Sequence, residues 1–93
     1  MCSSDLSNPS ERAQKFFEAG RLYESAGSSE PDLSQKQSVL MKAAEAYYQV
    51  YLIQVTSNLS RRELRQSLYP VLRTATPGTQ LAEDARKALD DLK

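Results

Sequence analysis

The 93-residue sequence contains no histidine, no tryptophan and a single cysteine. Histidine is the commonest general base and metal ligand, so its absence removes most catalytic and metal-binding classes. One cysteine cannot form an internal disulfide, and without further cysteines or histidines it cannot form a zinc site. Cys2 also lacks a histidine that could activate it as a nucleophile. We therefore expect no enzyme activity, no cofactor and no bound metal.

An excess of charge of either sign is missing as well. Twelve Lys and Arg residues balance twelve Asp and Glu residues, so the formal net charge is zero. A neutral chain has no overall attraction to nucleic acid or to an anionic membrane. No apolar run approaches the roughly 18 residues that a membrane helix needs. We therefore expect neither a nucleic-acid partner nor a membrane span.

The first six residues resemble the translated end of a sequencing adapter more than the start of a domain. Such a segment is excluded from reasoning about the fold, as an expression scar would be. It has a polar composition and no helical period. We expect residues 1–7 to be a disordered, non-native tail on a truncated chain, and residues 8–93 to form a single helical domain.

The sequence does contain apolar residues at helical spacing. They recur in steps of three and four within four segments, 9–26, 33–57, 61–75 and 80–92. The second segment has two adjacent apolar rows and a thin polar strip, which predicts a central helix covered on more than one side. Short connections make consecutive helices antiparallel neighbours. The predicted fold is therefore all-α, with two helical hairpins stacked on each other.

Cap and breaker residues predict where these helices begin and end. Four polar residues at the starts are typical N-caps: Asn8, Asp32, Ser60 and Thr79. Gly27 is expected to end the first helix, because glycine takes a positive φ without penalty. Pro70 removes a backbone hydrogen bond to Gln66, so it is expected to kink the third helix or to end its first part at Tyr69.

Three short patterns resemble the tetratricopeptide repeat. Its first-helix signature of a large aromatic, a small residue, glycine and tyrosine is matched in type and spacing by Phe16, Ala19, Gly20 and Tyr23. Its second-helix pattern of alanine and aromatic residues is resembled by Ala44, Tyr48 and Tyr51. Residues 77–79, with the alanines at 82 and 85, resemble a helix start in tetratricopeptide-like segments of bacterial envelope and assembly proteins.

The resemblance implies a divergent, tetratricopeptide-like pair of helical hairpins that serves as a non-catalytic protein–protein interaction or scaffold module. The alternative is a structural accessory segment of a larger enzyme or bacterial envelope protein. Gly20 lies inside a helix, where glycine costs about 1 kcal/mol relative to alanine. That cost indicates that a facing helix comes too close for a side chain.

Two groups of residues are candidates for binding a protein or peptide partner. Tyr47, Tyr48 and Tyr51 lie around one helical turn, but the first two point about 100° apart. One interpretation is two buried tyrosines with their hydroxyls at the core edge. The functional interpretation is that Tyr48, next to Leu52, lines a peptide-binding groove.

The second group is the basic cluster of Arg61, Arg62 and Arg65 at the start of the third helix, where cations oppose the helix dipole. A phosphate or nucleic-acid contact is one explanation of this cluster, and neutral overall charge argues against it. A structural explanation is stronger. In an antiparallel hairpin the arginines would face Asp90 and Asp91, at the end of the fourth helix, and form an exposed ion-pair network.

Overall fold

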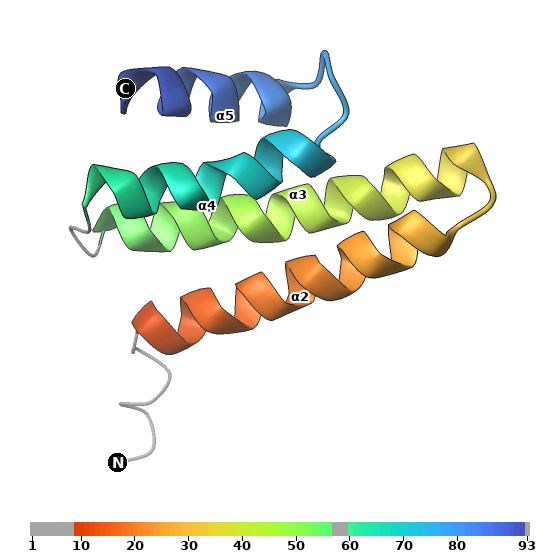
Figure 1. Cartoon of the computed structure of the whole chain (residues 1–93), viewed down its shortest axis with the longest axis horizontal. Coiled ribbons are helices and arrows are strands. Elements are labelled where there is room, and N and C mark those ends of the chain that lie inside the picture. The colour runs from red at the N-terminus through yellow and green to blue at the C-terminus, as the bar shows by residue number, and fades with distance from the viewer. Residues whose placement is uncertain (1–8, 57–59, 93) are drawn as a thin grey trace.

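The computed structural model describes residues 9–56 and 60–92, which form four helices (Figure 1). Helix α2 comprises Pro9–Ser29, α3 Leu33–Thr56, α4 Arg61–Thr74 and α5 Gln80–Asp91. No strand occurs in these two ranges, so the predicted all-α fold with four helices is confirmed. The predicted tail, residues 1–7, and the predicted N-cap Asn8 lie outside the described residues.

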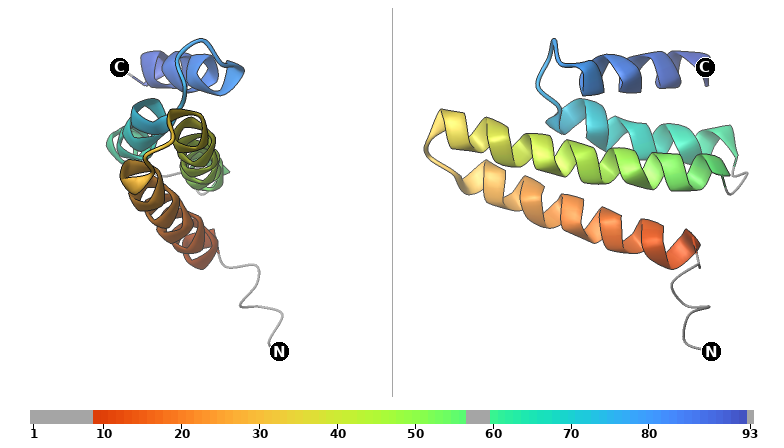
Figure 2. Two further views of the ribbon diagram at one scale, coloured as in Figure 1. Left: turned by 90° about the vertical axis from the view of Figure 1, so that its right-hand side faces the viewer. Right: turned by 180° about the vertical axis from the view of Figure 1, so that it is seen from behind.

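The helices stack in three layers, with α2 at one edge, α3 and α4 side by side in the middle, and α5 at the other edge (Figures 1 and 2). Consecutive helices run antiparallel and pack against each other. α3 also touches α5, so it contacts each of the other three helices. The prediction of a central helix covered on more than one side is therefore confirmed.

Small side chains dominate the core and allow the helices to approach closely. The larger cluster joins α3, α4 and α5 and consists of Ala43, Ala44, Tyr47, Leu68, Val71, Ala75, Ala82 and Ala85. A smaller cluster of Ala13, Val50 and Ile53, with Phe16 against it, lies between α2 and α3. Tyr47 is the largest of the fully buried side chains.

Three of the predicted N-caps are confirmed. The side chain of Asp32 accepts a hydrogen bond from the Ser34 amide at 2.9 Å. Ser60 accepts from the Glu63 amide, and Thr79 accepts from the Ala82 amide. Each cap satisfies one of the amides that the first turn of a helix leaves without an intrahelical partner.

The predicted end of the first helix is wrong. α2 continues through Gly27 to Ser29, so the helix ends three residues later than 26 and the connection to α3 is shorter than expected. Gly27 is buried, and a Cβ atom there would lie 2.9 Å from the Leu40 side chain. Its absent side chain therefore serves packing, and Pro31 ends the helix because proline disfavours helical backbone in the residue before it.

Pro70 does not end a helix, contrary to one of the two predicted outcomes. α4 runs through Pro70 to Thr74. Ala75 is the C-cap, and its amide donates to the Val71 carbonyl. The Thr74 hydroxyl donates to the Pro70 carbonyl at 2.8 Å, which ties the last turn together after the proline.

The predicted apolar face of α2 is only partly buried. Of the apolar residues at helical spacing in this segment, Ala13 and Gly20 are buried and Phe16 is half-buried. The other three are exposed, namely Phe17, Tyr23 and Ala26. α2 lies at an edge of the stack and packs chiefly on α3 (Figure 1). One neighbouring helix cannot cover an apolar stripe as wide as the one that this segment carries.

Candidate protein-binding surfaces

Nothing in the described interior points toward a ligand. Every buried side-chain nitrogen or oxygen in this part of the chain has a hydrogen-bond partner. No group of three or more Cys, Asp or Glu residues within residues 9–56 and 60–92 could hold a metal ion. Candidate sites therefore have to be sought on the surface.

The tyrosine patch consists of Tyr48, Tyr51, Leu52 and Val55 on α3. Their spacing of three, four and seven residues places them in one row of the helix. The Tyr48 and Tyr51 rings stack with their centroids 5.7 Å apart, and both rings pack against the core cluster. Leu52 and Val55 are 39% and 44% exposed. The patch thus combines two stacked aromatic rings that pack on the core with two exposed aliphatic side chains.

The electrostatic surroundings of Tyr48 include a carboxylate of α5. Burial raises the pKa of Tyr48, and the negative charge of Asp84 and the neighbouring Tyr51 raise it further. Tyr48 therefore stays neutral over the physiological range and offers a hydroxyl and an aromatic face at the border between α3 and α5. Of the two sequence interpretations, full burial applies to Tyr47, whereas Tyr48 and Tyr51 are half-buried.

The basic cluster lies at the start of α4 and next to the end of α5. Arg65 is half-buried, and its Nη1 donates to the Leu92 carbonyl at 3.0 Å. Arg61 and Arg62 are exposed, and neither forms an ion pair with another described residue. The antiparallel placement predicted for this end of the hairpin is confirmed, but Arg65 binds a helix-terminal carbonyl, and the predicted ion-pair network of Arg61 and Arg62 is not formed.

The two groups of candidates lie on different helices, the tyrosine patch on α3 and the basic cluster on α4. A hydrogen bond between Ser67 and Gln54 sets the register of α4 against α3. In antiparallel helices that register places Leu52 at the level of Tyr69. Arg62 lies seven residues before Tyr69, which is about 10 Å along the helix axis. Leu52 and Arg62 therefore lie well apart along the axis, whereas Val55 lies near the level of Arg65.

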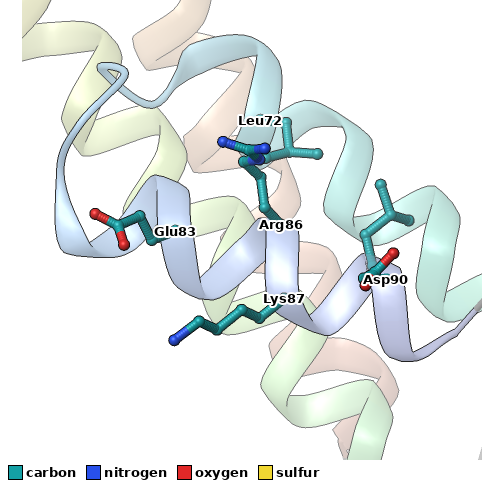
Figure 3. A pocket seen from close by; sticks show the side chains of 6 residues that line it. Leu72, Glu83, Arg86, Lys87 and Asp90 are labelled. Atoms are coloured by element: carbon teal, nitrogen blue, oxygen red, sulfur yellow. The ribbon is translucent and has the colours of Figure 1, made fainter.

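A pocket that the sequence did not indicate lies between α4 and α5 (Figure 3). It is open, and its volume is about 490 Å³. Two leucines and four charged side chains line it, namely Leu72, Glu83, Arg86, Lys87, Leu89 and Asp90. In Figure 3 the Arg86 side chain extends from α5 toward Leu72 of α4. The charged members recur every three or four residues, a pattern that by itself indicates only an exposed helix face.

A polar network ties α2, α3 and α4 together at the core edge. The Tyr47 hydroxyl donates to Glu24 Oε1 at 2.9 Å, and Arg73 donates to both oxygens of the same carboxylate. The hydrogen bonds from Arg73 lower the pKa of Glu24. Burial, followed by the bond to Glu24, raises the pKa of Tyr47 to about 12. This network is structural, because the three groups satisfy one another.

The sequence carried one signal for this network. Tyr47 falls in an otherwise apolar row of the central helix, and a buried tyrosine hydroxyl needs a hydrogen-bond partner. The identity of the partner could not be predicted, since 23 residues separate Tyr47 from Glu24 and 49 separate Glu24 from Arg73.

Comparison with known proteins finds no matching family, no similar curated protein and no similar solved structure. None of the described helices combines the length and the apolar character that crossing a membrane requires.

Proposed function

We propose that the chain is a non-catalytic module that binds another protein or a peptide through the tyrosine patch. The observation that carries this proposal is the exposure of Leu52 and Val55 beside the stacked rings of Tyr48 and Tyr51. A contiguous apolar patch on a small domain is typical of an interaction surface. The resemblance of the sequence to tetratricopeptide-like hairpins supports the same function.

Tyrosine and aliphatic residues suit binding for a physical reason. A tyrosine whose ring is already held by packing loses little conformational entropy when a partner covers it, and it offers a large apolar area with a polar tip. The stack of Tyr48 on Tyr51, which packs on the core cluster, supplies such a preorganised aromatic surface. Leu52 and Val55 would add the apolar area that a partner removes from water.

The proposal is tested by selecting random peptides on the immobilised chain and measuring the affinity of enriched peptides by fluorescence anisotropy. Leu52→Asp should weaken binding by roughly tenfold or more, because truncation at a hot spot costs more than about 1 kcal/mol. Leu22→Asp is the matched control, since Leu22 lies on α2 and is 72% exposed. Circular dichroism shows whether both variants remain folded.

Two results would contradict the proposal. If no peptide is enriched, the accessory-segment alternative takes its place. If Leu22→Asp weakens binding as much as Leu52→Asp does, the binding surface lies elsewhere.

A further inference from the structure

One stripe of α4 lies on the side of the helix that borders α5. It consists of Arg62, Arg65, Tyr69 and Leu72, which we call the arginine–tyrosine stripe. The spacings of three, seven and ten residues place all four on one side of the helix. Leu72 lines the 490 Å³ pocket, and Arg65 reaches the Leu92 carbonyl at the other end of α5. The stripe therefore extends from the pocket to the open end of the hairpin, about 15 Å along the axis.

The pocket opens on the side of α5 away from the tyrosine patch. Asp84 lies near enough to Tyr48 to influence it electrostatically. Arg86 and Asp90 line the pocket and point about 200° and 240° around the helix from Asp84. Lys87, about 60° from Asp84, lines the edge of the pocket nearest the tyrosine patch. The arginine–tyrosine stripe and the pocket thus form one surface, and the tyrosine patch belongs to another.

This surface combines apolar contact area with a surplus of positive charge. Tyr69 is 52% exposed, and Leu72 and Leu89 line the pocket. Four cations lie on the stripe or line the pocket, namely Arg62, Arg65, Arg86 and Lys87. Two carboxylates, those of Glu83 and Asp90, also line it, which leaves a surplus of two positive charges.

Arg62 is the cation that indicates which kind of partner this surface would bind. It is exposed, it forms no ion pair with another described residue, and it occupies the first turn of α4, where the helix dipole disfavours a cation. A carboxylate from outside the chain would remove this unfavourable interaction. Arg86 points toward Leu72 in Figure 3, so a second cation stands beside the apolar wall of the pocket.

We propose that the arginine–tyrosine stripe and the α4–α5 pocket bind an acidic amphipathic helix of another protein. A leucine-type side chain of that helix would occupy the pocket between Leu72 and Leu89. Its carboxylates would lie against Arg86 and, two to three turns further along, against Arg62. A helix laid in a groove uses anchors at this kind of spacing. This inference goes beyond the proposed function, because it concerns a different surface and does not depend on the tyrosine patch.

A second copy of the chain fits this surface poorly. A two-fold axis through the middle of the exposed face of α5 would place Glu83 opposite Asp90 and Arg86 opposite Lys87. Both contacts join like charges. Nucleic acid fits poorly as well, because Glu83 and Asp90 line the pocket and the whole chain has no net charge.

The test uses a fluorescein-labelled helical peptide of about 18 residues built from leucine, alanine and glutamate, together with a counterpart in which every glutamate is lysine. Binding to the full chain is followed by fluorescence anisotropy at low and at moderate salt. The glutamate peptide should bind, its affinity should fall with added salt, and the lysine peptide should bind at least roughly tenfold more weakly.

Two variants locate the site. Arg62→Glu and Arg86→Glu should each weaken binding of the glutamate peptide by roughly tenfold. Arg62→Glu places a carboxylate at a helix N-terminus, which favours folding, so a loss of binding by this variant reports on the surface. Arg12→Glu is the matched control, because Arg12 is exposed on α2 at the opposite edge of the stack. This control and Leu52→Asp should bind the peptide as the parent does.

Several results would overturn the inference. They are the absence of binding at low salt, equal binding of the lysine peptide, and an equal loss of affinity in Arg12→Glu. Displacement of the glutamate peptide by a single-stranded DNA oligonucleotide that binds more tightly would reassign the surface to nucleic acid. Because Leu52→Asp tests the tyrosine patch separately, failure of either proposal leaves the other standing.

Discussion

Arg73 of α4 donates two hydrogen bonds to the carboxylate of Glu24 in α2, from Nε at 2.6 Å and from Nη2 at 2.9 Å. The two residues are 49 positions apart and belong to helices that are not consecutive in the chain. The Tyr47 hydroxyl of α3 donates to the same carboxylate. A single glutamate thus links three of the four helices, and one of its partners is the fully buried Tyr47.

The Glu24 carboxylate should make stability depend on pH under acidic conditions. Its pKa in the folded state lies below the ordinary value of 4.5, so its contribution is fully present above pH 4.5 and is lost as the pH falls through the lowered pKa. The Arg73 side chain is 59% exposed, so screening keeps this contribution to about 1 kcal/mol or less. The free energy of unfolding, measured with urea at pH 7 and at pH 3, should fall less between these two pH values in Glu24→Gln than in the parent. Glu18→Gln, an exposed change on the same helix, should behave as the parent does; a smaller loss in this control would contradict the prediction.

The Tyr47 hydroxyl should make stability fall as the pH rises under alkaline conditions. Its pKa is raised from 10 to about 12 on folding, so its contribution is intact below pH 10 and is lost as the pH rises from 10 through 12. Tyr47→Phe should remove the part of the phenolate absorbance titration near pH 12. It should also cost about 1 kcal/mol at pH 7, through the lost hydrogen bond to Glu24. Tyr69→Phe, at a position 52% exposed, is the control, and an equal effect there would refute the assignment.

Gly20 should tolerate a side chain less well than Gly27 does. A Cβ atom at Gly20 would lie 2.9 Å from the Tyr47 ring, which is 1% exposed and cannot move aside. A Cβ atom at Gly27 would meet the flexible, half-buried side chain of Leu40. Gly20→Ala should therefore cost about 1–3 kcal/mol by overpacking, although alanine is the better helix former. Gly27→Ala should cost less than Gly20→Ala when both variants are compared by thermal unfolding. The reverse order would show that the Tyr47 ring can adjust.

Arg65 should hold the end of α5 in place through its bond to the Leu92 carbonyl. Arg65→Ala should cost about 1 kcal/mol and speed amide hydrogen exchange in the last turn of α5, because that carbonyl loses its charged donor. Arg62→Ala is the matched control and should neither cost stability nor speed this exchange, because it removes a cation that the helix dipole disfavours. A double-mutant cycle on Arg62→Ala and Asp91→Ala should show no coupling, since Arg62 pairs with no described carboxylate. Favourable coupling would restore the ion-pair network that the sequence predicted.

Local features of the helices were predictable from the sequence because they depend on near neighbours. The caps at Asp32, Ser60 and Thr79 each use a side chain and an amide two or three residues away. One apolar row of α3 is buried where the period predicts, at Ala43, Val50 and Ile53, whereas the other row ends at the exposed Val55. Gly27 misled the prediction because glycine serves equally well as a C-cap and as a close-packing residue. Only the position of Leu40 in the facing helix distinguishes the two.

The candidate surfaces were predictable only in part. Tyr48, Leu52 and the arginines of α4 were identified by residue type and spacing, but how the two helices are placed along each other follows from the register that Ser67 and Gln54 set. The α4–α5 pocket was not predicted at all, because Leu72 belongs to a different helix from its other lining residues.

By itself the sequence determined that the chain is all-α, where its helices begin, and that α3 is the central one. Hydrophobic periodicity and capping act within a few residues, so a single chain reveals them. Only the tertiary structure decided that Glu24, Tyr47 and Arg73 meet, that Gly20 faces the Tyr47 ring, and that the stripe containing Tyr69 borders a pocket. These contacts join residues from different helices. Their geometry depends on how side chains from separate helices interlock, and interlocking leaves no periodic trace in the sequence.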